Sequence, residues 1–214
     1  MTDTRLDRAG ELYERAVFAG DASAIRLGLL EVDAVEADAA LARGRLLHAS
    51  YLLDGSEDPA QLPLLERAVE LYDGLGDDRG LAEALFWVAI RHQVIHGDQA
   101  TALPLLSRAH RLAERADDRL TLSYVLRHLC FVEKDAGRVD RARELMAEST
   151  QLRRDLGFSA GVAANLVGLA YLSAELGRPD ESGPLLDEAA DLADRSGAAA
   201  VLTWVEEART NLGV

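Results

Sequence analysis

One stretch of the sequence gathers side chains that could bind a metal, hold a ligand or take part in catalysis. Residues 85–98 read LFWVAIRHQVIHGD and contain Trp87, one of two tryptophans in the chain. Arg91 follows four residues later, and His92 and His96 are themselves four residues apart. Residues three or four apart share one face of a helix. A metal site, a catalytic site, a binding face and an ordinary buried helix are therefore competing interpretations.

The two histidines have the i, i+4 spacing that some zinc sites use. The segment reads HQVIH, however, and lacks the glutamate of the H-E-x-x-H motif. Two further donors, His128 and Cys130, fall on a later helix at different heights. We therefore predict no metal site. His92 is expected to pack beside Ile95 in a partly buried seam, and His96 to lie near a helix C-terminus, where a cation suits the helix dipole.

Known catalytic motifs are missing from the sequence. It has no G-x-S-x-G, no glycine-rich phosphate loop before a helix, and no nucleophile paired with a base in one short motif. An enzyme stays open as an alternative because acidic and basic residues from distant repeats could project near one groove. These residues are Asp54, Lys134, Asp135 and Glu175. No cofactor is predicted.

The composition of the chain limits its partners. Its 214 residues are 49% hydrophobic, which is ordinary for a globular protein and argues against disorder. The formal net charge is -14 and the sequence pI is about 4.7. Nucleic acids and anionic membranes attract proteins through lysine and arginine, so a surface of this charge repels both. We expect neither as a partner.

No signal for export or membrane insertion is evident. The first residues, MTDTRLDRAGELYERAV, lack the basic start and apolar core of a signal peptide. No window approaches the roughly 18 uninterrupted apolar residues of a membrane span. Cys130 is the one cysteine, which excludes an intrachain disulfide and a cysteine-rich zinc site. The sequence predicts a soluble cytoplasmic protein.

A repeat of 40 residues organises the chain. The segments LPLLSRA, RELMAES and GPLLDEA begin at Leu103, Arg143 and Gly183, and LPLLERA at Leu62 lies one residue out of phase. In the other half of each unit, one apolar column holds Leu46, Phe86, Leu126 and Leu166. Glycines recur with the same period at Gly97, Gly137 and Gly177.

Each unit has the pattern of two amphipathic helices, with apolar residues at three-and-four spacing and a glycine ending the first helix. No segment shows the alternation or the β-branched clusters of strands. The predicted helices are residues 4–19, 22–32, 35–54, 59–75, 79–96, 99–116, 119–136, 139–156, 159–176, 179–196 and 199–212. The sequence therefore predicts an all-α fold.

The repeat resembles the tetratricopeptide repeat (TPR). The resemblance rests on LVGLA from Leu166, on LGR from Leu176, and on the small residues Ser182 and Ala189 of the following helix. The two preceding units match in the same way, and the resemblance covers residues 35–214. The unit is longer than the usual length of about 34 residues. Long units of this kind resemble those of bacterial regulators of the MalT and antibiotic-regulator (SARP) types.

One residue of the family pattern is absent. A tyrosine is usual three residues after the pair of leucine and small residue, but those places hold Gln93, Glu133 and Ser173. The resemblance still implies a right-handed superhelical stack of antiparallel hairpins, whose first helices line a concave surface.

We expect a single TPR-like domain over residues 1–214. It would comprise a degenerate N-terminal hairpin at 1–34, four repeats over 35–198 and a capping helix at 199–214. A stack of hairpins needs a polar outer face at its end. In the cap, Val201, Leu202 and Val205 are expected to face inward, and Glu206, Arg209 and Thr210 outward.

Three columns on the concave face mix aromatic and cationic residues. A core column would be uniformly apolar and a solvated column uniformly charged, whereas these columns are neither. Such a mixture is typical of recognition sites. The predicted ligand-binding residues are Tyr51, Trp87, Arg91, Tyr124, Arg127, Phe131, Lys134, Tyr171 and Trp204.

The centre of this predicted site is a pair of arginines. Neighbouring helices pack roughly 8–10 Å apart, so Arg91 and Arg127 on adjacent first helices are expected to converge, with Trp87 and Tyr124 beside them. In the alternative interpretation, the aromatic residues fill gaps between helices and the arginines pair with neighbouring acids.

These features predict a non-enzymatic regulatory or scaffolding module. Its groove would bind a peptide segment, a protein partner or a small ligand carrying an acidic group. The alternative is an enzyme of small-molecule biosynthesis with its active site in the same groove. The oligomeric state is left open between a monomer and a homodimer.

Overall fold

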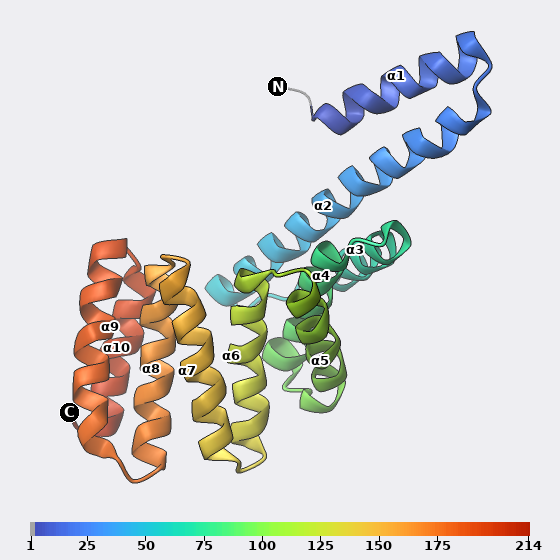
Figure 1. Ribbon diagram of the computed structural model, residues 1–214. Helices are drawn as coiled ribbons and strands as arrows, with labels where there is room; N and C mark the ends of the chain where they lie inside the picture. Colours follow the sequence, from blue (N-terminus) through green and yellow to red (C-terminus); the bar gives the residue numbers. More distant parts are fainter. Residues whose placement is uncertain (1–2) are drawn as a thin grey trace. The chain divides into compact units, whose positions relative to one another are not determined.

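The computed structural model describes residues 3–214, and every regular element in that range is helical (Figure 1). The all-α prediction is confirmed. The helices are α1 (Thr4–Ala19), α2 (Ala22–Asp54), α3 (Gln61–Leu75), α4 (Asp78–Ile90), α5 (Gln99–Arg115), α6 (Arg119–Asp135), α7 (Val139–Asp155), α8 (Ser159–Glu175), α9 (Ser182–Ser196) and α10 (Ala199–Leu212). A π-helical turn at Arg91–Ile95 continues α4, and a 3₁₀ turn at Pro179–Glu181 precedes α9.

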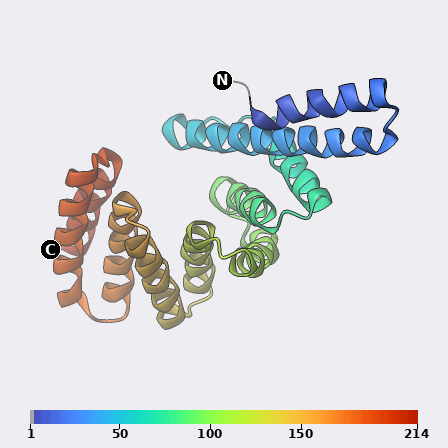
Figure 2. The same ribbon diagram turned by 45° about the horizontal axis from the view of Figure 1, so that its top comes forward.

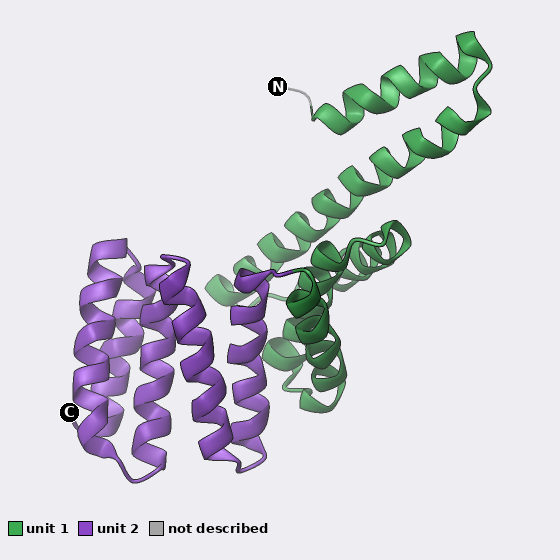
Figure 3. Cartoon of the chain, viewed as in Figure 1, with its two compact units in different colours: residues 1–116 green, residues 117–214 purple. Residues whose placement is uncertain are grey.

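The chain packs as two compact units, unit 1 at residues 1–116 and unit 2 at residues 117–214 (Figure 3). Unit 1 contains α1 to α5 and unit 2 contains α6 to α10. Inside each unit, helices pack chiefly against those that precede and follow them in the chain, as Figure 2 allows the reader to trace. The single-domain expectation remains a prediction beside this division.

Helix α2 corrects one sequence prediction. Separate helices were expected at 22–32 and 35–54, but α2 runs without interruption from Ala22 to Asp54. The junction residues Asp33 and Ala34 include neither glycine nor proline, so nothing local stops the helix. The first hairpin consequently shares α2 with the next one. Its early part packs against α1, and the part around Gly44 packs against α3.

The length of α2 raises the question of a membrane span. At 33 residues it exceeds the length that a bilayer requires. Charged residues such as Arg26, Glu31 and Glu36 interrupt its apolar surface. No helix within residues 3–214 combines the length and apolarity needed to cross a membrane.

The predicted turns have the expected chemistry. Gly97, Gly137 and Gly177 have φ angles of 65°, 75° and 74°, in the left-handed region where a Cβ atom is unfavourable. An aspartate caps the helix that follows Gly97: the side chain of Asp98 accepts a hydrogen bond from the Thr101 amide at 3.0 Å, whereas the helices after Gly137 and Gly177 have no side-chain cap. Asp118 caps α6 in the same way. The glycines that recur with the repeat therefore lie at helix ends, as the sequence predicts.

In unit 1, α2 and α3 are joined by polar contacts as well as by apolar packing. The Tyr72 hydroxyl donates a hydrogen bond to Asp38 at 2.6 Å, and the Gln61 amide donates one to the Gly44 carbonyl at 3.3 Å. Burial and the neighbouring Asp38 raise the pKa of Tyr72 above its ordinary value. The Tyr72 ring lies directly on Gly80 of α4, so it connects three helices.

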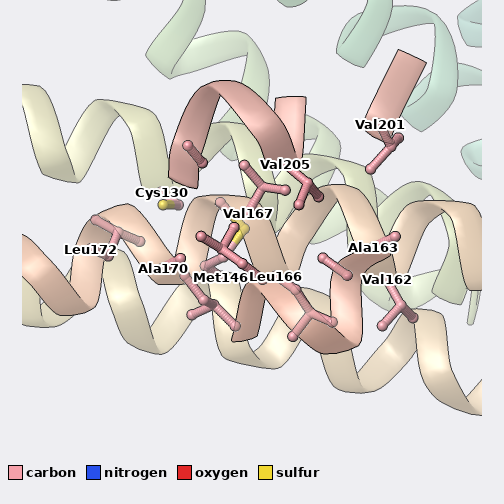
Figure 4. Close-up of a cluster of buried hydrophobic side chains, with 14 of the residues drawn as sticks. Cys130, Met146, Val162, Ala163, Leu166, Val167, Ala170, Leu172, Val201 and Val205 are labelled. Carbon is pink, nitrogen blue, oxygen red and sulfur yellow. The ribbon is translucent and has the colours of Figure 1, made fainter. Parts of the chain in front are cut away.

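Unit 2 has a continuous apolar core between its hairpins (Figure 4). Met146, Leu166 and Val205 come from three different helices and are almost completely buried there. Helix α10 buries Val201 and Val205 against this core, while Glu206 and Thr210 are exposed, as the sequence predicts for a cap. The C-terminal end of the stack is thus closed by a helix with a polar outer side.

Alanine substitutions at two glycines of unit 1 should change the free energy of unfolding in opposite directions. A methyl group at Gly80 would overlap the buried Tyr72 ring, whereas Gly74 in α3 has open space around its Cα. Gly80→Ala should lower the free energy of unfolding by about 1–3 kcal/mol through overpacking. Gly74→Ala should raise it by about 0.5–1 kcal/mol through helix propensity. Urea denaturation measures both, and a shift of the same sign for both variants would contradict this packing.

Candidate functional site

Two of the sequence-predicted residues of unit 1, Tyr51 and Trp87, lie beside a buried histidine. His48 of α2 is 4% exposed, and its ring centroid lies 5.5 Å from that of Trp87 and 6.4 Å from that of Tyr51. The Arg45 guanidinium carbon lies 5.5 Å from the centroid of the Trp87 ring. Nδ1 of His48 finds no hydrogen-bond partner within residues 3–214. Tyr51 and Trp87 are thus brought together, around a residue that the sequence interpretation did not select.

Arg91 belongs to the π-helical turn and is buried. Its Nη2 pairs with the Glu57 carboxylate, and His96 Nε2 lies 3.5 Å from the same carboxylate. Arg91 therefore pairs with an acidic residue, as the alternative interpretation of the sequence expects. His92 and His96 have ring centroids 6.3 Å apart. In the described chain, no three histidine, cysteine or acidic residues are grouped so that they could hold a metal ion.

Unit 2 contains a different arrangement around Arg127 of α6. Its Nη1 donates hydrogen bonds to the Ala164 carbonyl at 3.1 Å and to Oδ1 of Asn165 at 2.8 Å. The guanidinium carbon lies 5.2 Å from the centroid of the Phe131 ring. Arg127 and Phe131, both predicted from the sequence, are thus in contact. All of the hydrogen-bond acceptors around Arg127 are neutral.

A second arginine, Arg153 of α7, shares the acceptor of Arg127. Its Nη1 donates to Asn165 Oδ1 at 3.0 Å and to the Gly161 carbonyl at 2.9 Å, and its Nε donates to Ser123 Oγ at 3.3 Å. The side chain is one of the largest fully buried ones, at 2% exposure. Its Nη2 has no acceptor within residues 3–214. Arg127, Arg153 and Asn165 are called the arginine centre below.

Two aromatic rings flank Arg153. Its guanidinium carbon lies 4.6 Å from the Tyr124 centroid and 5.5 Å from the Phe158 centroid, and the two ring centroids are 6.1 Å apart. A guanidinium over an aromatic face is attracted by the ring quadrupole. The rings therefore offset part of the cost of burying the cation, but they supply no negative charge.

Helix α8 is shaped to admit the two arginines. A Cβ atom at Gly161 would overlap Phe158 and come within 3.0 Å of Arg153 Cδ. At Gly168 it would lie 2.9 Å from Met146 Cε and 4.0 Å from Arg127 Nη1. Glycine inside a helix is less favourable than alanine by roughly 0.5–1 kcal/mol. Glycine therefore makes α8 less stable at two positions, where the arginines and their neighbours pack closely against the helix.

Sequence reasoning missed Arg153 and Asn165, although the 40-residue period contains a signal for them. The equivalents of Arg153 one repeat before and after are Ala113 and Ala193, and those of Asn165 are Val125 and Val205. All four of these equivalents are buried and apolar. Ser149, which accepts a hydrogen bond from Asn165 at 2.9 Å, likewise replaces buried alanines at 109 and 189. Three polar residues thus interrupt apolar columns at one level of the stack.

The arginine centre has uncompensated positive charge. Neither guanidinium has a carboxylate within ion-pairing distance in residues 3–214. Burial lowers the pKa of Arg127, and burial together with the charge of Arg127 lowers the pKa of Arg153 to about 10. Both side chains remain cationic at neutral pH. Two cations are therefore held close together in a chain whose net charge is -14.

A cavity of about 190 Å³ borders Arg153 on the side of the turn between α7 and α8. Phe158 and Leu192 give it apolar walls, and Arg154 and Glu188, which form an ion pair at 2.8 Å, also line it. A neighbouring hollow shares Phe158 and Leu192 and continues past Arg195. The space next to Arg153 is large enough for a carboxylate and several attached atoms, since a water molecule takes up about 30 Å³ in the liquid.

The remaining predicted residues have other partners. Lys134 is exposed and lies 3.7 Å from Glu175, and the Tyr171 hydroxyl accepts a hydrogen bond from Asn211 at 3.0 Å. Trp204 is 44% exposed on α10. Arg91 and Arg127 belong to different units, so their convergence stays a prediction.

No family model matches the chain, and no curated protein is significantly similar to it. The chemistry of the arginine centre therefore has to be argued from its own residues and contacts.

His48 should make the stability of unit 1 depend on pH. Burial lowers its pKa below the ordinary 6.5, so the unfolded chain binds the proton more readily. The free energy of unfolding therefore falls as the pH drops below 6.5 and through the lower folded-state pKa. His48→Phe cannot ionise and should lose less stability than the wild type between about pH 7.5 and about pH 5. Equal losses in urea denaturation at the two pH values would exclude this role.

Arg153 should contribute little to the stability of the ligand-free protein. Burying a cation without a counter-charge costs several kcal/mol, which offsets its neutral hydrogen bonds. Arg153→Met should therefore change the free energy of unfolding by less than about 1 kcal/mol, or raise it. Asn165→Ala, which leaves both guanidiniums without their shared acceptor, should cost about 2–4 kcal/mol. Chemical denaturation compares them, and an equal loss in both variants would identify Arg153 as a structural residue.

Proposed function

We propose that the protein is a non-enzymatic binding module that recognises a carboxylate through the arginine centre of unit 2. The observation that carries the proposal is that buried Arg153 and partly buried Arg127 have no carboxylate partner, with Nη2 of Arg153 left without an acceptor. A buried cation of this kind is costly in a folded protein unless a counter-charge arrives. A ligand anion would supply that charge.

The form of the donor favours a carboxylate. A guanidinium presents parallel N–H groups that match the two carboxylate oxygens, and such charge-assisted bonds are roughly twice as strong as neutral ones. Arg153 has one terminal nitrogen fully used and the other unbonded. Binding would therefore use an existing donor, with no need to break the contacts to Asn165.

The surroundings favour a ligand with an apolar or aromatic body. Phe158 and Leu192 line the cavity beside Arg153, and Tyr124 and Phe158 flank its guanidinium. An extended peptide segment, or the acidic tail of a protein partner, is the first choice, because the neighbouring hollow extends the space past the cavity. A small acidic metabolite acting as an effector is the second.

The proposed scaffold is a stack of TPR-like repeats with a right-handed superhelical twist. Its support is the 40-residue sequence period, the helix-ending glycines and the packing of helices on their chain neighbours inside each unit. A regulatory or scaffolding protein in the cytoplasm, akin to the long-repeat modules of bacterial regulators, fits a binding function without chemistry of its own.

The enzyme alternative has no observation in its favour. Lys134 and Glu175 pair with each other at an exposed position. Burial raises the pKa of the Cys130 thiol to about 12, so it is not a nucleophile at neutral pH.

The binding proposal is tested with benzoate, which joins a carboxylate to an aromatic ring, and with acidic hexapeptides that carry an aromatic residue beside a glutamate. Calorimetry should give a Kd on the order of 1 mM for benzoate and tighter binding for the best peptide. Neutral benzamide should not bind measurably. Arg127→Met and Arg153→Met should weaken peptide binding by about 2–4 kcal/mol.

The matched control is Arg143→Met, because Arg143 of unit 2 already pairs with Glu181 at 2.8 Å. It should leave the affinity unchanged. Phe158→Leu should weaken binding with less dependence on salt than the arginine variants, since its contribution is apolar. Unchanged affinity in both Arg127→Met and Arg153→Met would show that the arginine centre is not the binding site.

A further inference from the structure

The hairpin of α1 and α2 exposes apolar side chains along one face. Within unit 1, α2 is the main packing partner of α1, and Leu12 is the one residue of α1 that is buried, among those described. Tyr13 and Val17 are 67% and 54% exposed, and Ile25 and Leu29 of α2 are 58% and 59% exposed. Monomeric proteins rarely leave so many large apolar residues together in water.

These side chains surround a hollow of about 430 Å³. Small residues, Ala9, Ala16, Ala24 and Gly28, also line it. None of its lining residues is charged, although 28% of the chain is. The side chains Tyr13, Val17, Ile25 and Leu29 together with this hollow are called the N-terminal face below.

The N-terminal face differs in chemistry from the exposed side of α10. That helix presents Glu206, Glu207 and Thr210 to solvent, whereas no residue that lines the hollow of the N-terminal face is charged.

We propose that the N-terminal face binds the same face of a second copy of the chain, so that two α1–α2 hairpins form a four-helix bundle with two-fold symmetry. An isologous interface requires one surface to complement itself. The face supplies large projecting side chains and a floor of small residues, so the side chains of each copy fill the hollow of the other.

The chemistry of the face favours a second copy over other occupants. The Tyr13 hydroxyl is the one side-chain polar group among the hollow's lining residues, so an extended peptide would find few partners for its backbone groups. The backbone groups of a helix form hydrogen bonds within the helix, so a helix needs only apolar contacts from this face. Two chains of charge -14 repel each other, and this uncharged face lets them meet without opposing like charges.

The exposed area also suits a dimer. The exposed surface of the large side chains of the N-terminal face amounts to roughly 500–600 Å² per copy. A pair of copies would bury on the order of 1,000–1,200 Å², which is at the lower limit for a specific interface. Interfaces of this size are typical of weak, reversible association.

Sedimentation equilibrium of the full chain tests the proposal over concentrations from about 1 to about 200 μM. The wild type should pass from monomer to dimer across this range. Ile25→Asp and Leu29→Asp together should weaken dimerisation by at least about 30-fold, because they place charges against their own copies. Leu53→Asp, also in α2 and 88% exposed but outside the face, is the matched control and should leave the dimer unchanged.

Circular dichroism of the double variant should retain the wild-type helical content, which separates loss of the interface from loss of the fold. A wild type that stays monomeric at every concentration would overturn the proposal. So would a dimer that survives the double variant, or vesicle binding by a monomeric wild type. Benzoate binding should be the same in the double variant, since the arginine centre lies in unit 2.

Discussion

Two cationic side chains in unit 2 share a single neutral acceptor, the side-chain oxygen of Asn165. Repulsion between Arg127 and Arg153 and the loss of their hydration both oppose this arrangement. It persists because Asn165 is itself held by Ser149, which in turn donates to the Ser123 carbonyl at 2.5 Å. The polar network thus connects α6, α7 and α8. Two positive charges therefore lie close together within a chain that is strongly acidic overall.

The packing of the helices in unit 2 leaves space for this polar network. The glycines of α8 leave room for two long side chains, and the Tyr124 and Phe158 rings flank one of them, between helices that otherwise meet through alanine, valine and leucine. Many other arginines in the described chain pair with acids, as Arg91 does with Glu57 and Arg143 with Glu181. Unit 1 has a related but weaker feature, since buried His48 leaves Nδ1 without a partner beside Trp87. The contrast between paired and unpaired cations is what singles out the arginine centre.

Much of the fold could be predicted from the sequence because it depends on local rules. Apolar spacing gave the helices, and Gly97, Gly137 and Gly177 marked turns that require positive φ. The continuous helix α2 was not predicted, because a break was expected at residues 33 and 34, where neither glycine nor proline enforces one. Tyr124, Arg127 and Phe131 were predicted from three columns that mix aromatic and cationic residues. Arg153 was overlooked because it lies on the second helix of a repeat, where its equivalents one repeat before and after are alanines. Its hydrogen-bond partners come from α6 and α8, so its isolation from acids follows from tertiary packing and not from spacing along the chain.

The proposed function depends on an anion binding to Nη2 of Arg153, the terminal nitrogen that has no acceptor within residues 3–214. The most direct measurement is the side-chain ¹⁵N spectrum of the arginines during titration with benzoate. The account predicts that the resonances of Arg153 and Arg127 shift together and saturate with the Kd found by calorimetry, while those of Arg143 stay in place. Saturation of benzoate binding with no change at Arg153 would contradict the account.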